Sequence, residues 1–278
     1  MKKIFALTLV LLWSFGGSGA ADIKPFGIPR TQVVPVKDSG TGRQYELYIK
    51  LPAEYSENTD KTYPVIYMTD GDVEMDLLSG TTEFLMPNAI LVGISWQKDE
   101  EGNAVRGSRT RDFTLFEYET IDGPTGEASN YLSFLRNDII RYVENTFRTK
   151  PDERAFLGYS SAAEFGAYVL LAQPDTFKYY LLGSPALDKL STQYLDELEV
   201  ETAQQAQPFN VHVFLSTAEN ERPGRLELTE KLVSVLERRS GAGLSLAGLK
   251  IIKDAGHVTA VPETFGRAIK WLSQQIGE

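Results

Sequence analysis

The segment RAFLGYSSAAEFGAYVL, residues 154–170, places a serine between an apolar run and a helical pattern. This strand–turn–helix context is typical of a nucleophile elbow, whose sharp turn exposes the hydroxyl of the central serine, here Ser160. Such a turn needs small side chains two residues before and after the serine. Gly158 meets this need, and Ala162 nearly does, since one methyl group replaces a hydrogen. A helix N-cap is the alternative interpretation, because serine is also favoured there.

A serine nucleophile needs a base, and the sequence contains two histidines. His212 lies inside the apolar run NVHVFLS, where we expect a residue of the core or of a strand edge. His257 follows the last predicted strand and precedes the last predicted helix, which is where an α/β-hydrolase carries its base. His257 is therefore the predicted general base for Ser160.

A third group should orient the imidazole and stabilise its cation. We expect it in the segment STAENERPG, which follows the strand-like run VHVFLS and offers Glu219 and Glu221. We prefer Glu221, because it lies further out on the loop and can turn back toward the histidine. Asp254 is a weaker candidate at the end of the strand before His257. Any one of these carboxylates could instead be a solvated surface group.

Acyl transfer also needs N–H donors for the developing oxyanion. The backbone N–H of Ser161, directly after the nucleophile, is one predicted donor. The second should follow the third strand, in YMTDGDVEMD, where Gly71 lets the backbone turn and the N–H of Asp72 points at the site.

The stretch DGDVEMD, residues 70–76, also alternates acidic side chains as a calcium-binding loop does. An EF-hand loop needs glycine at its sixth position and glutamate at its twelfth. Met75 and Thr81 occupy these positions, so we expect no metal site here.

Apolar runs bounded by turn residues alternate with segments of helical spacing, which indicates an α/β fold with a largely parallel sheet. The early run RQYELYIKLP alternates polar and apolar residues and predicts an antiparallel strand with one solvated face. Helices are expected at 131–147, 225–239 and 263–276, and 97–128 and 187–208 are long irregular stretches, the second with a helical insertion. The eight predicted strands are 32–36, 43–51, 63–69, 89–96, 154–158, 179–183, 211–217 and 249–253.

The N-terminus carries two lysines, an apolar run over 4–15 and then small residues. This pattern predicts a Sec-type signal peptide over 1–20, cleaved near Ala21 or Asp22, and a single domain over 21–278 in the periplasm or outside the cell. Zero cysteines exclude thiol catalysis and argue against a lipoprotein anchor. A net charge of −10 without a Lys/Arg cluster argues against nucleic acid or an anionic membrane as partner.

Together, YELYIKLPAEY, YPVIYMTDGD, RTRDFT, FLRNDIIRYVENTFR, RAFLGYSSAAEFGAYVL, GSPAL and the Gly256-His257 pair resemble the putative-esterase family of α/β-hydrolases. Its members include esterase D, enterochelin-type esterases, feruloyl esterases and mycolyltransferases. The resemblance covers nearly the whole predicted mature chain. It implies the α/β-hydrolase fold, with a mostly parallel eight-stranded sheet and helices on both faces.

The family pattern at the nucleophile is G-H-S-x-G-G, from which Tyr159, Ala162 and Ala163 depart. The resemblance supports Glu221 as the acid and the Asp72 N–H as oxyanion donor. It also implies that residues 109–114, RTRDFT, border the substrate pocket. The pocket residues expected on this basis are Arg109, Arg111, Asp112 and Tyr159.

The expected activity is that of a secreted or periplasmic serine carboxylesterase that forms an acyl-enzyme on Ser160 without a metal or organic cofactor. Its substrate would be a small-molecule or carbohydrate-linked ester. A siderophore trilactone and a feruloyl or acetyl ester are both open, as is acyl transfer to an acceptor other than water. A catalytically inactive hydrolase fold that acts as a binding module is the alternative from another class.

Overall fold

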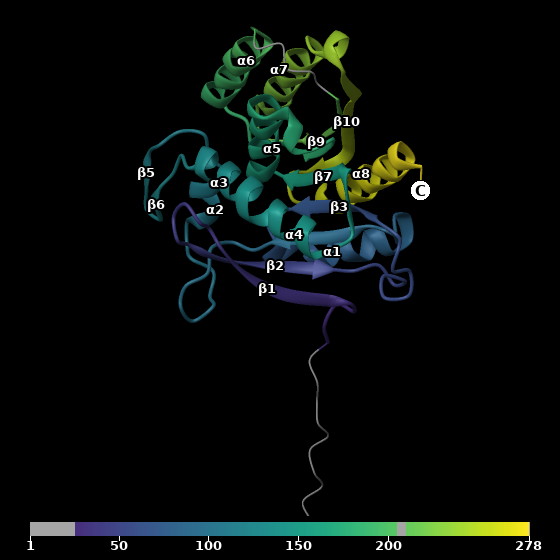
Figure 1. Ribbon diagram of the computed structural model, residues 1–278. Helices are drawn as coiled ribbons and strands as arrows, with labels where there is room; N and C mark the ends of the chain where they lie inside the picture. Colours follow the sequence, from purple (N-terminus) through teal and green to yellow (C-terminus); the bar gives the residue numbers. More distant parts are fainter. Residues whose placement is uncertain (1–25, 205–209, 278) are drawn as a thin grey trace, which may run out of the picture.

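The computed structural model describes residues 26–204 and 210–277, and an eight-stranded sheet forms their centre (Figure 1). The strand order is β1-β2-β4-β3-β7-β8-β9-β10. Within this sheet, the β1–β2 and β2–β4 pairs are antiparallel and the other five pairs are parallel, so the predicted mostly parallel sheet is confirmed. The strands are β1 (Thr31–Lys37), β2 (Gln44–Lys50), β3 (Tyr63–Met68), β4 (Ile90–Ile94), β7 (Thr149–Tyr159), β8 (Tyr179–Gly183), β9 (Val211–Asn220) and β10 (Leu244–Gly256).

The burial of each strand follows its sequence pattern. In β2, the alternating Tyr45, Leu47 and Ile49 are buried, as expected for an antiparallel strand with one face on the core. Every residue of β3 and β4 is buried, which matches their continuous apolar runs. The two outer strands are irregular: β1 contains Pro35, and β10 shifts register twice against β9.

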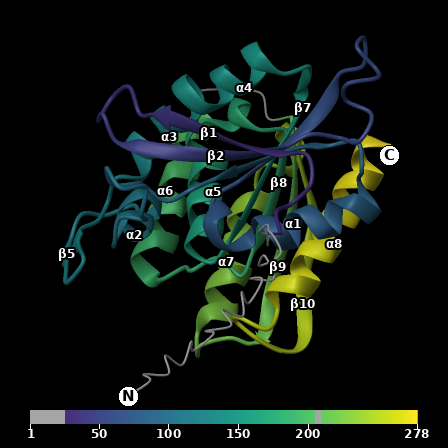
Figure 2. The same ribbon diagram turned by 90° about the horizontal axis from the view of Figure 1, so that it is seen from below.

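Helices cover both faces of the sheet, as predicted (Figures 1 and 2). One hydrophobic cluster packs α1 and α8 against one face, and a larger cluster packs α3, α5, α6 and α7 against the other. The helices are α1 (Gly71–Leu85), α2 (Ser108–Phe113), α3 (Ala128–Phe134), α4 (Arg141–Thr146), α5 (Ser161–Ala172), α6 (Lys189–Gln204), α7 (Arg225–Glu237) and α8 (Val261–Ile276).

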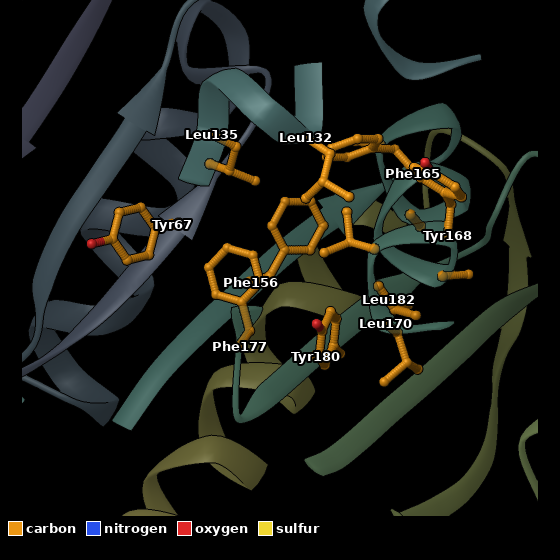
Figure 3. Close-up of a cluster of buried hydrophobic side chains, with 14 of the residues drawn as sticks. Tyr67, Leu132, Leu135, Phe156, Phe165, Tyr168, Leu170, Phe177, Tyr180 and Leu182 are labelled. Atoms are coloured by element: carbon orange, nitrogen blue, oxygen red, sulfur yellow. The ribbon is translucent and has the colours of Figure 1, made fainter. Parts of the chain in front are cut away.

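Aromatic rings fix α5 on the sheet (Figure 3). The ring of Phe156, on β7, lies 6.0 Å from Phe165 of α5 and 5.4 Å from Phe177, which precedes β8. All three rings are fully buried. This packing sets the direction in which the chain leaves β7 and enters α5.

Some expected elements differ in detail. The predicted helix over 131–147 is a continuous run of α3, a π-helical segment η1 (Leu135–Ile140) and α4. The irregular stretch 97–128 contains α2 and a two-stranded hairpin of β5 (Glu119–Thr120) and β6 (Gly123–Pro124).

The predicted insertion over 187–208 forms α6, and residues 205–209 lie outside the described residues. The predicted signal peptide over 1–20 also lies outside them, and the single domain over 21–278 stays a prediction. None of the described helices combines the length and apolar character needed to cross a bilayer.

Candidate active site

Ser160 occupies a strained turn between β7 and α5. Its backbone has φ 61° and ψ −123°, a conformation that costs a non-glycine residue about 1–3 kcal/mol. The Ser160 N–H donates to the carbonyl oxygen of Gly183 over 2.9 Å, which ties the turn to the end of β8. A Cβ added at Gly158 would stand 2.6 Å from the carbonyl oxygen of Ala162, so this position has room for glycine alone. Ala162 itself is accommodated and fully buried.

The structure brings the predicted base and acid to Ser160. Nε2 of His257 lies 2.9 Å from Ser160 Oγ, and Nδ1 of His257 lies 2.7 Å from Oε1 of Glu221. The Glu221 side chain is 2 % exposed and that of His257 is 34 % exposed. A carboxylate that accepts from Nδ1–H leaves Nε2 free to accept the serine proton. The arrangement can therefore convert the Ser160 hydroxyl into a nucleophile.

The alternative acids and the second histidine lie elsewhere. Glu219 forms an ion pair with Lys253 over 2.6 Å and accepts the backbone N–H of Asp254 over 2.9 Å. His212 stacks on Tyr179, with 5.3 Å between ring centroids, at the beginning of β9. Of the carboxylates weighed from sequence, the structure places Glu221 on the imidazole.

Tyr159, directly before the nucleophile, contacts the loop of the base. Its hydroxyl donates to the carbonyl oxygen of His257 over 2.5 Å, and the two rings lie 5.3 Å apart. The side chain is buried, and burial raises the pKa of its hydroxyl to about 12, so this group remains a proton donor at neutral pH. Sequence reasoning marked Tyr159 only as a departure from the family pattern and a pocket residue.

The two predicted oxyanion donors lie in the first turns of helices. Ser161 begins α5, and Asp72 is the second residue of α1. Amides at these positions have no acceptor within their own helix. Neither donates to a backbone oxygen among the described residues. The Asp72 carboxylate is held by the Tyr48 hydroxyl over 2.9 Å and the Trp96 N–H over 2.6 Å, which fixes this end of α1.

Arg109 connects the turn before α1 with the nucleophile elbow. Its Nε and one terminal nitrogen bind the two Asp70 oxygens over 2.7 and 2.8 Å, and that nitrogen also lies 3.5 Å from the Tyr159 carbonyl oxygen. The Trp96 indole N–H donates to Asp70 over 2.7 Å. Asp70 is 2 % exposed and has a positive φ of 63°. The oxygens of Asp70 and Asp72, the first two acidic residues of the calcium-like pattern, are thus directed at protein donors.

Arg111 and Asp112 brace α2 against β2. Arg111 pairs with Asp112 over 2.8 Å, and the Tyr45 hydroxyl donates to Asp112 over 2.9 Å. Asp112 is 3 % exposed, and its burial outweighs these partners and raises the pKa of the carboxyl.

A cavity of about 220 Å³ opens at the nucleophile. Arg109, Arg111, Asp112 and Tyr159 are not among its lining residues. Arg109 and Tyr159 contact the elbow and the loop of His257, whereas Arg111 and Asp112 contact Tyr45 of β2. Sequence reasoning missed Arg222 and Arg225, although both belong to the short stretch ERPGR that begins with Glu221. The residues that line the cavity are Ser160, Ser161, Ala186, Glu221, Arg222, Arg225 and His257.

The sheet, the covering helices and the elbow between β7 and α5 define an α/β-hydrolase fold. A family model described as putative esterase matches residues 39–256, and the chain belongs to this family of ester hydrolases.

Individual relatives agree with this placement. The ferri-bacillibactin esterase BesA of Bacillus subtilis (strain 168) is 24% identical over 271 residues, covering 88% of this chain and 90% of that protein. The BES protein from Bacillus cereus superposes with a TM-score of 0.77 and 19% identity, over 91% of this chain and 98% of that one. The siderophore hydrolase EstA from Aspergillus nidulans gives a TM-score of 0.70 and 18% identity, over 96% and 99% of the respective chains. At these identities the solved structures support the fold.

Proposed function

We propose that the protein is a serine carboxylesterase that hydrolyses its substrate through an acyl-enzyme on Ser160. The observation that carries this proposal is the position of His257, whose two ring nitrogens lie within hydrogen-bond distance of Ser160 and Glu221. Its support from the comparisons is membership of a family of ester hydrolases.

In the proposed reaction, Ser160 Oγ attacks the ester carbonyl while His257 Nε2 takes its proton. Glu221 holds the imidazole and stabilises its cation. The N–H groups of Ser161 and Asp72 donate to the oxyanion of the tetrahedral intermediate. His257 then protonates the departing alcohol, and water, activated by the same imidazole, releases the acid and restores Ser160.

For the ester itself, we favour a siderophore trilactone. The name of the relative from Bacillus subtilis, a ferri-bacillibactin esterase aligned over most of both chains, supports this choice. A feruloyl or acetyl ester is the alternative. A panel of these esters, ranked by kcat/KM for the wild type and a Ser160→Ala variant, decides between them.

The activity is tested with a short-chain 4-nitrophenyl ester and a fluorophosphonate probe. The wild type should hydrolyse the ester and be labelled at Ser160, and Ser160→Ala should do neither. A folded wild-type protein that gives neither result would instead be a catalytically inactive hydrolase fold that serves as a binding module.

We further propose that the protein is exported to the periplasm or the medium and is cleaved near Ala21 or Asp22. Support comes from the lysines, the apolar run and the small residues at its N-terminus. N-terminal sequencing of the protein recovered from a secretion-competent host tests this. An intact Met1 in the exported protein would contradict it.

A further inference from the structure

Two arginines flank the candidate nucleophile on the side of α7. Arg222 and Arg225 both line the cavity that contains Ser160 and His257. Among the described residues, neither guanidinium has a carboxylate oxygen within ion-pair distance, whereas most other arginines near the sheet do. Arginine that lines a cavity without a carboxylate partner is available to a ligand, because its planar group carries five N–H donors.

The protein backbone fixes one of these arginines close to the nucleophile. A terminal nitrogen of Arg225 donates to the carbonyl oxygen of Pro185 over 3.2 Å. The next residue, Ala186, donates its N–H to the carbonyl oxygen of Ser160 over 3.0 Å. The guanidinium of Arg225 is therefore attached to the same loop that holds Ser160, and within the described part of the chain no carboxylate forms an ion pair with it.

The lining of the cavity carries two guanidinium groups, of Arg222 and Arg225, and one carboxylate, of Glu221, so cationic groups are in excess there. Glu221 is bonded to His257. Glu164, one turn into α5, is 8 % exposed, and burial raises the pKa of its carboxyl to about 8, although a hydrogen bond with Ser191 and the charge of Arg225 act against this rise. The raised pKa favours the uncharged form of the Glu164 carboxyl near neutral pH. The cavity is a local positive site in a chain with a net charge of −10.

We propose that Arg225, together with Arg222, binds an anionic group of the substrate, a carboxylate or a phenolate, beside the scissile ester. This inference rests on the proposed esterase function and adds a specificity that the triad alone does not have. Arg225 is the anchored half of the site. Arg222, which is exposed, adds charge from the rim.

Two pairs of chromogenic esters test the proposal, each a carboxylate and its uncharged carboxamide isostere. In one pair, 4-nitrophenyl adipate monoester and its terminal amide, the charge lies on the acyl part. In the other, 3-carboxy- and 3-carbamoyl-4-nitrophenyl butyrate, it lies on the leaving alcohol. The wild type should prefer the carboxylate in at least one pair, and that pair identifies the side of the ester that faces Arg225.

Arg225→Gln should lower the carboxylate-to-carboxamide ratio of kcat/KM about 10- to 100-fold, as expected for loss of a hydrogen bond to a charged group. Arg222→Gln should have a smaller effect that weakens with added salt, since exposed charges are screened. Arg225→Lys should retain part of the preference. Arg141→Gln, an exposed arginine on α4, changes the net charge equally and should leave the ratio unchanged.

The failure of this inference can be separated from failure of the esterase proposal. Ser160-dependent hydrolysis with equal kcat/KM for both members of each pair would overturn the anion site and leave the esterase intact. If no ester is hydrolysed, calorimetric binding of the four esters to Ser160→Ala decides the question alone. Tighter binding of a carboxylate that is lost in Ser160→Ala/Arg225→Gln supports the site, and equal binding overturns it.

Discussion

The hydroxyl of Tyr159 donates a hydrogen bond to the backbone carbonyl oxygen of His257, so the residue before Ser160 holds the loop of the proposed base. The two residues are 98 positions apart in the sequence. Ser160 and His257 are thus joined twice, through their own side chains and through Tyr159.

Replacing this tyrosine should loosen the base. Tyr159→Phe should lower kcat about 2- to 10-fold, the value of one neutral hydrogen bond, with little change in KM. Tyr118→Phe, at a half-exposed tyrosine, is the matched control. An unaltered kcat in Tyr159→Phe would show that the bond does not position His257.

Replacement of Glu219, near the end of β9, and of Glu221, directly after β9, should have very different effects on kcat. Glu221→Gln should lower kcat by about 10²- to 10⁴-fold, because the imidazole loses the partner that fixes its tautomer. Glu219→Gln should change kcat less than about 3-fold, since Glu219 contacts Lys253 and the Asp254 N–H and its exposed ion pair contributes little. Steady-state kinetics on a 4-nitrophenyl ester, with circular dichroism to verify folding, provides the comparison. Equal losses in the two variants would mean that the acid is wrongly assigned.

The two small residues that flank Ser160, Gly158 and Ala162, should differ in their tolerance of substitution. Gly158→Ala should destabilise the fold by about 1–3 kcal/mol, because its Cβ would collide with the backbone of Ala162. Ala162→Gly should cost only about 1 kcal/mol, the helix-propensity difference, while retaining activity. Urea denaturation measures both free energies of unfolding. A Gly158→Ala variant as stable as the wild type would contradict the close approach of β7 and α5.

Loss of Arg109 should leave the buried carboxylate of Asp70 without its cationic partner. Arg109→Gln should lower the free energy of unfolding by about 3–5 kcal/mol, because Asp70 is 2 % exposed and loses its bidentate partner. The double variant Arg109→Gln/Asp70→Asn should recover part of this loss. If the double variant is no more stable than the single one, the pair is not coupled.

Glu164 should make stability pH-dependent. Its pKa rises from 4.5 to about 8 on folding, so between these values the unfolded chain releases a proton that the folded chain retains. The contribution of Glu164 to the free energy of unfolding is therefore fully present below about pH 4.5. It is lost as the pH rises from there toward about 8.

Glu164→Gln should remove this loss. The Tm of the variant, relative to the wild type, should therefore rise steadily across that interval, with a free-energy slope approaching about 1.4 kcal/mol per pH unit. Thermal unfolding at several pH values measures it. A Tm difference that is constant with pH would mean that Glu164 titrates normally.

Much of the fold was accessible from sequence because its signals are local. The apolar runs of β3, β4 and β9 and the alternation in β2 each depend on their own residues. With two histidines in the chain, the position of His257 in the loop before α8 also left a narrow choice of base.

The rest depends on neighbours that sequence does not reveal. Arg109 was expected to border the substrate pocket, and its ion pair with Asp70, 39 positions away, was not predicted. The guanidinium of Arg225 is held beside the cavity by a hydrogen bond to the carbonyl oxygen of Pro185, 40 positions away. Charged side chains often contact residues that are distant in the sequence. A short segment such as ERPGR has no periodicity from which such contacts could be predicted.

The irregular outer strands β1 and β10 affect the tendency of the protein to aggregate through its sheet edges. A straight, unpaired strand at a sheet border is a template on which another chain can polymerise into fibrils. Pro35 removes a donor from β1, and the second register shift of β10 falls between Ile252 and Gly256, immediately before His257. The register shift that immediately precedes His257 therefore also makes this border of the sheet a poor seed for amyloid growth.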